Sequence, residues 1–149
     1  MNIRRASEGD LGALLRLYEQ LSPANAGSNR AKALVALRAI LERDGVSLLV
    51  AEADDAVVGT VTLVIVPNLT HDSQPWAQVE NMVTEASTRG TGVGRRLIED
   101  CLRLARDAGC YKVQLQSGNQ RRSHENDAHG FYEHLGFANS SAGFRLYLD

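Results

Sequence analysis

Hydrophobic and polar positions along this chain follow two periods, which predict helices and strands in a mixed order. Apolar residues at three- and four-residue spacing indicate amphipathic helices, whereas short β-branched or alternating runs indicate strands. The expected helices span about 8–21, 30–43, 93–108 and 128–135. The expected strands span 2–5, 46–53, 57–66, 79–84, 111–116, 137–138 and 144–148.

The unit of strand, helix and strand over residues 79–116 predicts how the sheet is connected. A helical crossover joins parallel strands, so 79–84 and 111–116 should be parallel neighbours. The pair 46–53 and 57–66, joined through Asp54-Asp55, should be an antiparallel hairpin. We therefore expect an α/β fold (α+β mixed sheet) with helices on both faces, and a single domain over residues 1–149.

Composition excludes several classes of function. A formal net charge of −2 gives no general attraction to nucleic acids or anionic membranes. No apolar run approaches the ~20 residues that span a bilayer, and the N-terminus lacks a signal-peptide pattern, so we expect a cytoplasmic protein. Cys101 and Cys110 should lie too far apart for a disulfide, and the four histidines show no zinc-ligand spacing, so we expect no metal.

A glycine-rich segment, RGTGVG (Arg89–Gly94), joins the strand 79–84 to the following helix. The first N–H groups of a helix have no partner within it, and the helix dipole adds partial positive charge there. Glycines let a phosphate oxygen approach the backbone, and Arg89, Arg95 and Arg96 add full charges. The P-loop ending and the complete dinucleotide fingerprint are both missing, which disfavours ATP and NAD. The alternative is an ordinary glycine-rich turn.

The spacing Arg-x-x-Gly-x-Gly, seen in Arg89, Gly92 and Gly94, resembles the pyrophosphate motif of GNAT-superfamily N-acetyltransferases. A second segment, FYEHLGF (Phe131–Phe137), resembles the F-Y-E-x-x-G-F pattern near the end of many GNAT domains. The order of the expected elements is also similar, and the resemblance covers almost the whole chain. It implies the GNAT fold, in which the sheet splays between its two parallel strands, and acetyl-CoA as the cosubstrate.

The resemblance also implies where acetyl-CoA binds. The pantetheine arm would enter the gap between the parallel strands, and the diphosphate would lie on the glycine-rich segment. Asn119 or Asn126 would face the cofactor from a loop that is longer than the family pattern. The other implied contacts are Met82, Val83, Thr84, Arg89, Gly90, Thr91, Gly92, Val93, Gly94 and Arg95.

Two side chains carry the chemistry that the resemblance implies. Tyr132, a phenol that is protonated at neutral pH, would protonate the departing thiolate, although it could instead be a core tyrosine. Glu80 would take a proton from the amine, or only orient that amine, since an ordinary carboxylate is a weak base. The alternative is a solvent-facing or salt-bridged glutamate without a catalytic role. Alternation along the strand predicts that Glu80, Met82 and Thr84 share one face, opposite Val79, Asn81 and Val83.

The expected activity is transfer of an acetyl group to the primary amine of a small molecule, by direct attack in a ternary complex. The segments VENMV and GCYKV also resemble aminosugar-phosphate N-acetyltransferases, which is a narrower alternative. A non-catalytic acyl-CoA-binding regulatory module is a third. His71 and Trp76 are candidates to line the acceptor site, although a loop histidine is more often simply solvated. Arg121 and Arg122 are candidates to meet an anionic acceptor or the 3′-phosphate of the cofactor, with solvated surface charge as the more common alternative. Dimerisation is common in the family, so a homodimer is possible.

Overall fold

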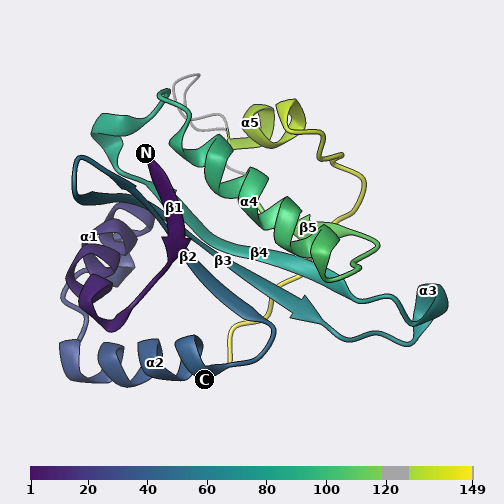
Figure 1. Ribbon diagram of the computed structural model, residues 1–149, viewed down its shortest axis with the longest axis horizontal. Coiled ribbons are helices and arrows are strands. Elements are labelled where there is room, and N and C mark those ends of the chain that lie inside the picture. Colours follow the sequence, from purple (N-terminus) through teal and green to yellow (C-terminus); the bar gives the residue numbers. More distant parts are fainter. Residues whose placement is uncertain (119–127, 149) are drawn as a thin grey trace.

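The computed structural model describes residues 1–118 and 128–148, and in them five strands form one sheet in the order β1-β2-β3-β4-β5 (Figure 1). The strands are β1 (Asn2–Arg5), β2 (Val46–Ala53), β3 (Ala56–Val66), β4 (Trp76–Thr84) and β5 (Val113–Leu115). The helices are α1 (Leu11–Leu21), α2 (Arg30–Glu42), α3 (Thr70–Ser73), α4 (Val93–Asp107) and α5 (Ala128–His134). Neighbouring strands are antiparallel except β4 and β5, which are parallel. The predicted mixed fold is confirmed.

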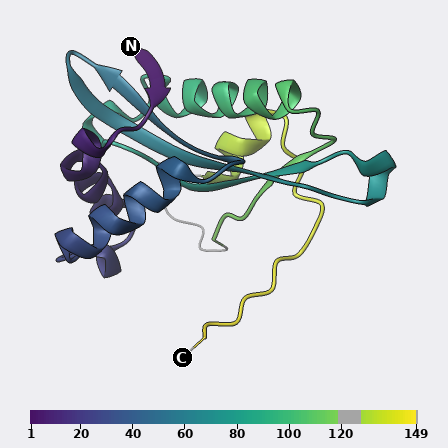
Figure 2. The ribbon, with the colours of Figure 1, turned by 60° about the horizontal axis from the view of Figure 1, so that its bottom comes forward.

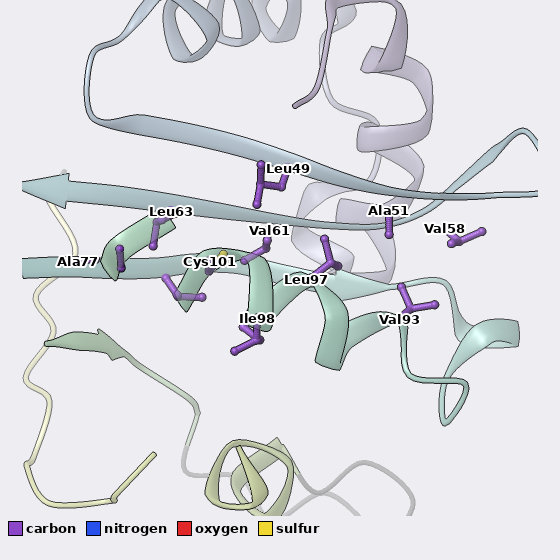
Figure 3. Close-up of a cluster of buried hydrophobic side chains, with 12 residues drawn as sticks. Leu49, Ala51, Val58, Val61, Leu63, Ala77, Val93, Leu97, Ile98 and Cys101 are labelled. Carbon is purple, nitrogen blue, oxygen red and sulfur yellow. The ribbon is translucent and has the colours of Figure 1, made fainter. Parts of the chain in front are cut away.

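Helices cover both faces of the sheet, with α4 and α5 on one side and α1 and α2 on the other (Figure 2). The cluster beneath α4 joins strand residues such as Val61 and Leu63 to Leu97, Ile98 and Cys101 of the helix, all completely buried (Figure 3). A second cluster beneath α1 and α2 contains Leu14, Leu17, Leu37, Val50 and Val83. Burial on both faces explains why β2 and β3 are apolar almost throughout rather than alternating.

Asp10 ties β1 to the start of α1. Its carboxylate accepts two hydrogen bonds from the Arg4 guanidinium, at 2.8 and 2.9 Å, and one from the Ser7 backbone N–H at 2.7 Å. The Arg4 bonds, opposed by desolvation, lower the pKa of Asp10 to about 2. Ser7 and Asp10 therefore form a capping box, with Arg4 as an additional partner of the carboxylate.

We expect Asp10 to make the fold sensitive to acid. Because its pKa is lowered in the folded state, its stabilising contribution is complete above about pH 4 and is lost as pH falls toward about 2. The lowered pKa corresponds to ~2 kcal/mol of unfolding free energy. Asp10→Asn should remove that amount at pH 7 and flatten the acid limb in urea denaturation measured across pH. Glu8→Gln, which breaks an exposed pair with Arg38, is the control and should change little.

A bulge interrupts β4. Thr60 of β3 pairs with Val83 and Thr62 pairs with Glu80, so two residues of β4 lie opposite the single residue between these threonines. Asn81, the first of those two, has a φ of 51° in the left-handed region, which asparagine tolerates better than most residues. The bulge therefore inserts one extra residue into the strand.

The extra residue makes the predicted alternation of β4 wrong. Val79 and Met82 both pack with the cluster beneath α4, whereas Val83 belongs to the cluster beneath α1. Glu80 follows Val79 directly and so lies on the face opposite Met82. Strict alternation would have put Glu80 and Met82 together and would have kept Val79 and Val83 on one side.

The closing strands predicted over 137–138 and 144–148 are not formed, which corrects that part of the sequence analysis. Phe137 packs against the cluster beneath α4, and Gly143 lies beside the Gln116 side chain at the end of β5. The chain then runs away from the sheet as an extended tail (Figure 2). A strand pattern becomes a strand only where a partner supplies hydrogen bonds, and the described residues supply none to this tail.

Candidate active site

The parallel strands β4 and β5 separate part-way along β4. Their pairing extends from Ala77 opposite Val113 to Val79 opposite Leu115, so β5 is shorter than the predicted 111–116. Beyond Val79, the described part of the chain pairs β4 only with β3. The segment from Glu80 to Thr84 therefore presents a backbone edge on the side from which β5 has diverged. The splayed parallel pair expected from the sequence is confirmed.

The glycine-rich segment ends in a helix N-terminus for which the N-cap residue, a glycine, supplies no side-chain hydrogen bond. Gly92 is the N-cap residue of α4, with a φ of 91°, and Gly90 has a φ of 79°. Just before them, the Thr88 carbonyl accepts hydrogen bonds from both the backbone N–H and the hydroxyl of Thr91, at 3.2 and 2.6 Å. A helix that begins at glycine has no side-chain oxygen for its first N–H groups, which suits an anion.

Gly94 also lies at a packing contact that the motif does not reveal. A Cβ atom there would lie 2.7 Å from Met82 Cε and 3.3 Å from Phe131 Cζ. The missing side chain therefore lets the edge of β4, the first turn of α4 and α5 meet at one point. Sequence reasoning missed this contact, because nothing local to the motif shows which residues will face Gly94.

The cationic groups of the loop are at the surface. Arg89, Arg95 and Arg96 are all exposed, and Arg95 pairs with Glu99 one helical turn later at 2.8 Å. An exposed pair of this kind contributes little stability, so a bound anion can compete for the guanidinium. The loop thus joins uncapped N–H groups to nearby positive charge.

Tyr132 lies on the same side of the sheet as α4. Its ring makes edge contacts with Phe131 and Phe137, with centroids 5.1 and 5.9 Å away. Burial, and secondarily the neighbouring Cys101, raises the pKa of Tyr132 above its usual value. Burial likewise raises the pKa of Cys101 to about 12, so that thiol stays protonated. The Tyr132 hydroxyl is therefore protonated at neutral pH, in largely apolar surroundings.

Glu80 lies on the opposite face and is exposed. Its carboxylate accepts a hydrogen bond of 2.9 Å from Gln78, whose own side-chain oxygen accepts one of 3.0 Å from Gln114. An exposed carboxylate in this position suits a role in relaying a proton or orienting an amine. Tyr132 and Glu80 therefore lie on different faces of the sheet.

A second buried phenol, which sequence reasoning missed, lies near the bulge. The Tyr18 hydroxyl on α1 interacts with those of Thr60 and Thr62, the two residues of β3 that flank the bulge in β4. Burial raises the pKa of Tyr18, so this phenol is also protonated at neutral pH. The sequence hinted at polar partners on this strand only through Thr60 and Thr62, two threonines at alternate positions of an otherwise apolar segment.

The remaining candidates lie elsewhere or outside the described residues. His71 stacks on Tyr111 with ring centroids 3.9 Å apart, and Trp76 begins β4, at the opposite end from the glycine loop. The predictions for Asn119, Asn126, Arg121 and Arg122 fall on residues that the structure does not describe. Within residues 1–118 and 128–148, no group of three or more potential ligands is placed to hold a metal, and no helix is long and apolar enough to cross a membrane.

The sequence pattern of the acetyltransferase (GNAT) family matches residues 14–137. This chain belongs to that family. The matched segment of the GNAT chain contains the splayed strands, the glycine loop, Glu80 and Tyr132. GNAT acetyltransferases generally use acetyl-CoA as cosubstrate, which agrees with a helix N-terminus open to an anion.

The similar proteins include acetyltransferases and one protein that is described as a transcriptional regulator. A glucosamine 6-phosphate N-acetyltransferase of Trypanosoma brucei brucei is 36% identical over 92 residues, which cover 62% of this GNAT chain and 58% of that protein. A putative acetyltransferase from Agrobacterium tumefaciens strain C58 is 37% identical, with a TM-score of 0.91 over 99% of this chain and all of that one. A transcriptional regulator from Bacillus halodurans C-125 is 28% identical, with a TM-score of 0.89 over 99% of both chains.

Proposed function

We propose that this protein is an N-acetyltransferase that transfers the acetyl group of acetyl-CoA to the primary amine of a small molecule. The observation that carries the proposal is the contact around Gly94. There the edge of β4 that no described strand pairs with, the glycine at the start of α4 and the helix that bears Tyr132 come together. The arrangement offers a phosphate site, a backbone edge and a proton donor to one elongated cosubstrate.

The cosubstrate would bind along these three features in order. Its diphosphate would accept hydrogen bonds from the backbone of residues 90–95, with Arg89 and Arg95 nearby. Its pantetheine arm would pair with the open edge of β4 at Met82, Val83 and Thr84, as an added strand would. A backbone N–H of Met82 or Val83 would then stabilise charge that develops on the thioester oxygen.

Acetyl transfer would proceed by direct attack. The amine nitrogen attacks the thioester carbonyl carbon, a C–N bond forms, and the C–S bond breaks. Tyr132 donates its proton to the departing thiolate, and Glu80 receives the proton that the amine releases, directly or through water. Cys101 is buried and protonated, so an acetylated cysteine intermediate is disfavoured.

An aminosugar phosphate is the acceptor with a specific observation in its favour. The Trypanosoma brucei brucei relative is named as a glucosamine 6-phosphate N-acetyltransferase, and its match covers 62% of this chain. Arg121 and Arg122, outside the described residues, would supply charge for the phosphate. The chain spans just under three fifths of that relative's length, so the broader amine acceptor remains the main proposal.

A panel of amines with acetyl-CoA tests the function. We expect thiol release above the no-amine rate with at least one primary amine. Comparing glucosamine 6-phosphate with glucosamine separates the two acceptor classes, since a phosphate-binding acceptor site should favour the phosphorylated sugar at least tenfold in kcat/KM. Tight CoA binding without thiol release from any amine would instead identify a non-catalytic acyl-CoA-binding module.

A further inference from the structure

A ladder of side-chain hydrogen bonds (Gln114, Gln78 and Glu80) crosses the parallel strands on the face of the sheet opposite α4. The side-chain N–H of Gln114 in β5 donates a hydrogen bond of 3.0 Å to the side-chain oxygen of Gln78 in β4. The side-chain N–H of Gln78 then donates one of 2.9 Å to Oε1 of Glu80. An amide donates at its nitrogen and accepts at its oxygen, so both bonds of the ladder run in one direction, from β5 toward the carboxylate.

The register of the sheet explains this ladder. Gln78 and Gln114 are direct partners in the parallel pairing, and one more pair, Val79 with Leu115, follows them. Neighbouring strands lie about 5 Å apart, a distance that two glutamine side chains can bridge. Glu80 comes directly after the last pair, on the same face of β4 as Gln78, because side chains alternate along a strand. The paired part of the sheet therefore supplies the donor, and the first residue of the splayed part supplies the acceptor.

Glu80 stands where β4 loses its regular surroundings. The pairing with β5 ends one residue earlier, and Asn81, with its φ of 51°, begins the bulge directly afterwards. An exposed glutamate at such a position has several rotamers to choose from, and holding one of them costs side-chain entropy. A hydrogen bond to a carboxylate is stronger than one to a neutral oxygen and can offset that cost. Gln78 is only partly exposed and is itself held by Gln114, so it is a well-fixed donor.

We propose that Gln78 is a positioning residue for acetyl transfer, which holds Oε1 of Glu80 and so directs the other carboxylate oxygen, Oε2, to the acceptor amine. Gln114 acts one step further away, by fixing the Gln78 amide. The inference rests on the proposed function, because it requires Glu80 to meet the amine. A carboxylate that is already oriented accelerates the reaction of the bound amine, whereas acetyl-CoA affinity does not depend on it. Gln78 should therefore act on the rate, and only through Glu80.

A double-mutant cycle measured by steady-state thiol release tests that dependence. Gln78→Leu should lower kcat about tenfold and leave the KM for acetyl-CoA unchanged, and Gln114→Leu should lower kcat about threefold. In the Glu80→Ala background, Gln78→Leu should change kcat by at most about twofold, because no carboxylate remains to be positioned. Gln74→Leu is the matched control, since Gln74 is an exposed glutamine just before β4, and its kcat should equal that of the wild type. A wild-type kcat in Gln78→Leu, or equal losses with and without Glu80, would overturn the proposal.

Nuclear magnetic resonance of the ¹⁵N-labelled full chain tests the ladder without turnover. The side-chain amide signals of Gln78 should move on Glu80→Ala and on Gln114→Leu, whereas those of Gln74 should stay in place. Gln78 signals that do not move would overturn the proposal even in an active enzyme. Gln78 signals that move in a protein that releases no thiol with any amine would show that the ladder exists and that acetyl transfer is wrong, and the positioning role would fall with it. Failure of the ladder and failure of the proposed function are therefore distinguishable.

Discussion

Tyr132→Phe should lower turnover by about 100-fold while leaving the folded state and the affinity for acetyl-CoA nearly unchanged. The substitution keeps the ring that packs against Phe131 and Phe137 and deletes only the hydroxyl. Because burial raises the pKa of Tyr132, the wild-type hydroxyl stays protonated beyond the ordinary range of a tyrosine. If deprotonation of Tyr132 limits the wild-type enzyme at high pH, the loss of activity should therefore begin only above about pH 10.

Steady-state thiol release, calorimetric titration with CoA and thermal unfolding together test this expectation. Tyr111→Phe is the matched control, since it deletes a phenol that stacks on His71 at the far end of β4. A Tyr132→Phe enzyme that turns over like the wild type would remove the proton donor from the mechanism. A variant that unfolds would instead identify Tyr132 as a core residue.

Gly92→Val should weaken CoA binding at least tenfold, or by ~1.4 kcal/mol. Gly92 is the N-cap of α4, and a branched side chain there would occupy the space through which a diphosphate approaches the first N–H groups. It would also strain a residue whose φ is 91°. The expected loss therefore combines a steric block with a disturbed helix start.

Gly109→Val separates those two effects. Gly109 lies beyond the other end of α4, has a φ of 77°, and has open space where a Cβ would stand, as Gly92 does. Both variants should lose similar folding stability, but only Gly92→Val should lose CoA affinity in calorimetric titration. Equal CoA affinity in the two folded variants would exclude the glycine loop as the phosphate site.

The sequence by itself determined the features that depend on short stretches of chain. The hairpin through Asp54 and Asp55 formed as predicted, because both residues adopt the positive φ of a tight turn. The helix after Gly92 ends at Asp107, shortly before Gly109, and the Cys110 N–H bonds back to the Ala105 carbonyl. The crossover predicted the parallel pair β4 and β5. Periodicity and turn chemistry are local, so a single sequence contains them.

Tertiary structure alone decided which side chains meet at the candidate site. The bulge at Asn81 exists only as a mismatch between two strands, so the faces of Glu80 and Met82 could not be read from β4 alone. Gly94 matters because Met82 and Phe131, distant in sequence, converge on it. The tail has the pattern of a strand but lies unpaired, because strand formation requires the hydrogen-bonding edge of a neighbour, which no local pattern can provide.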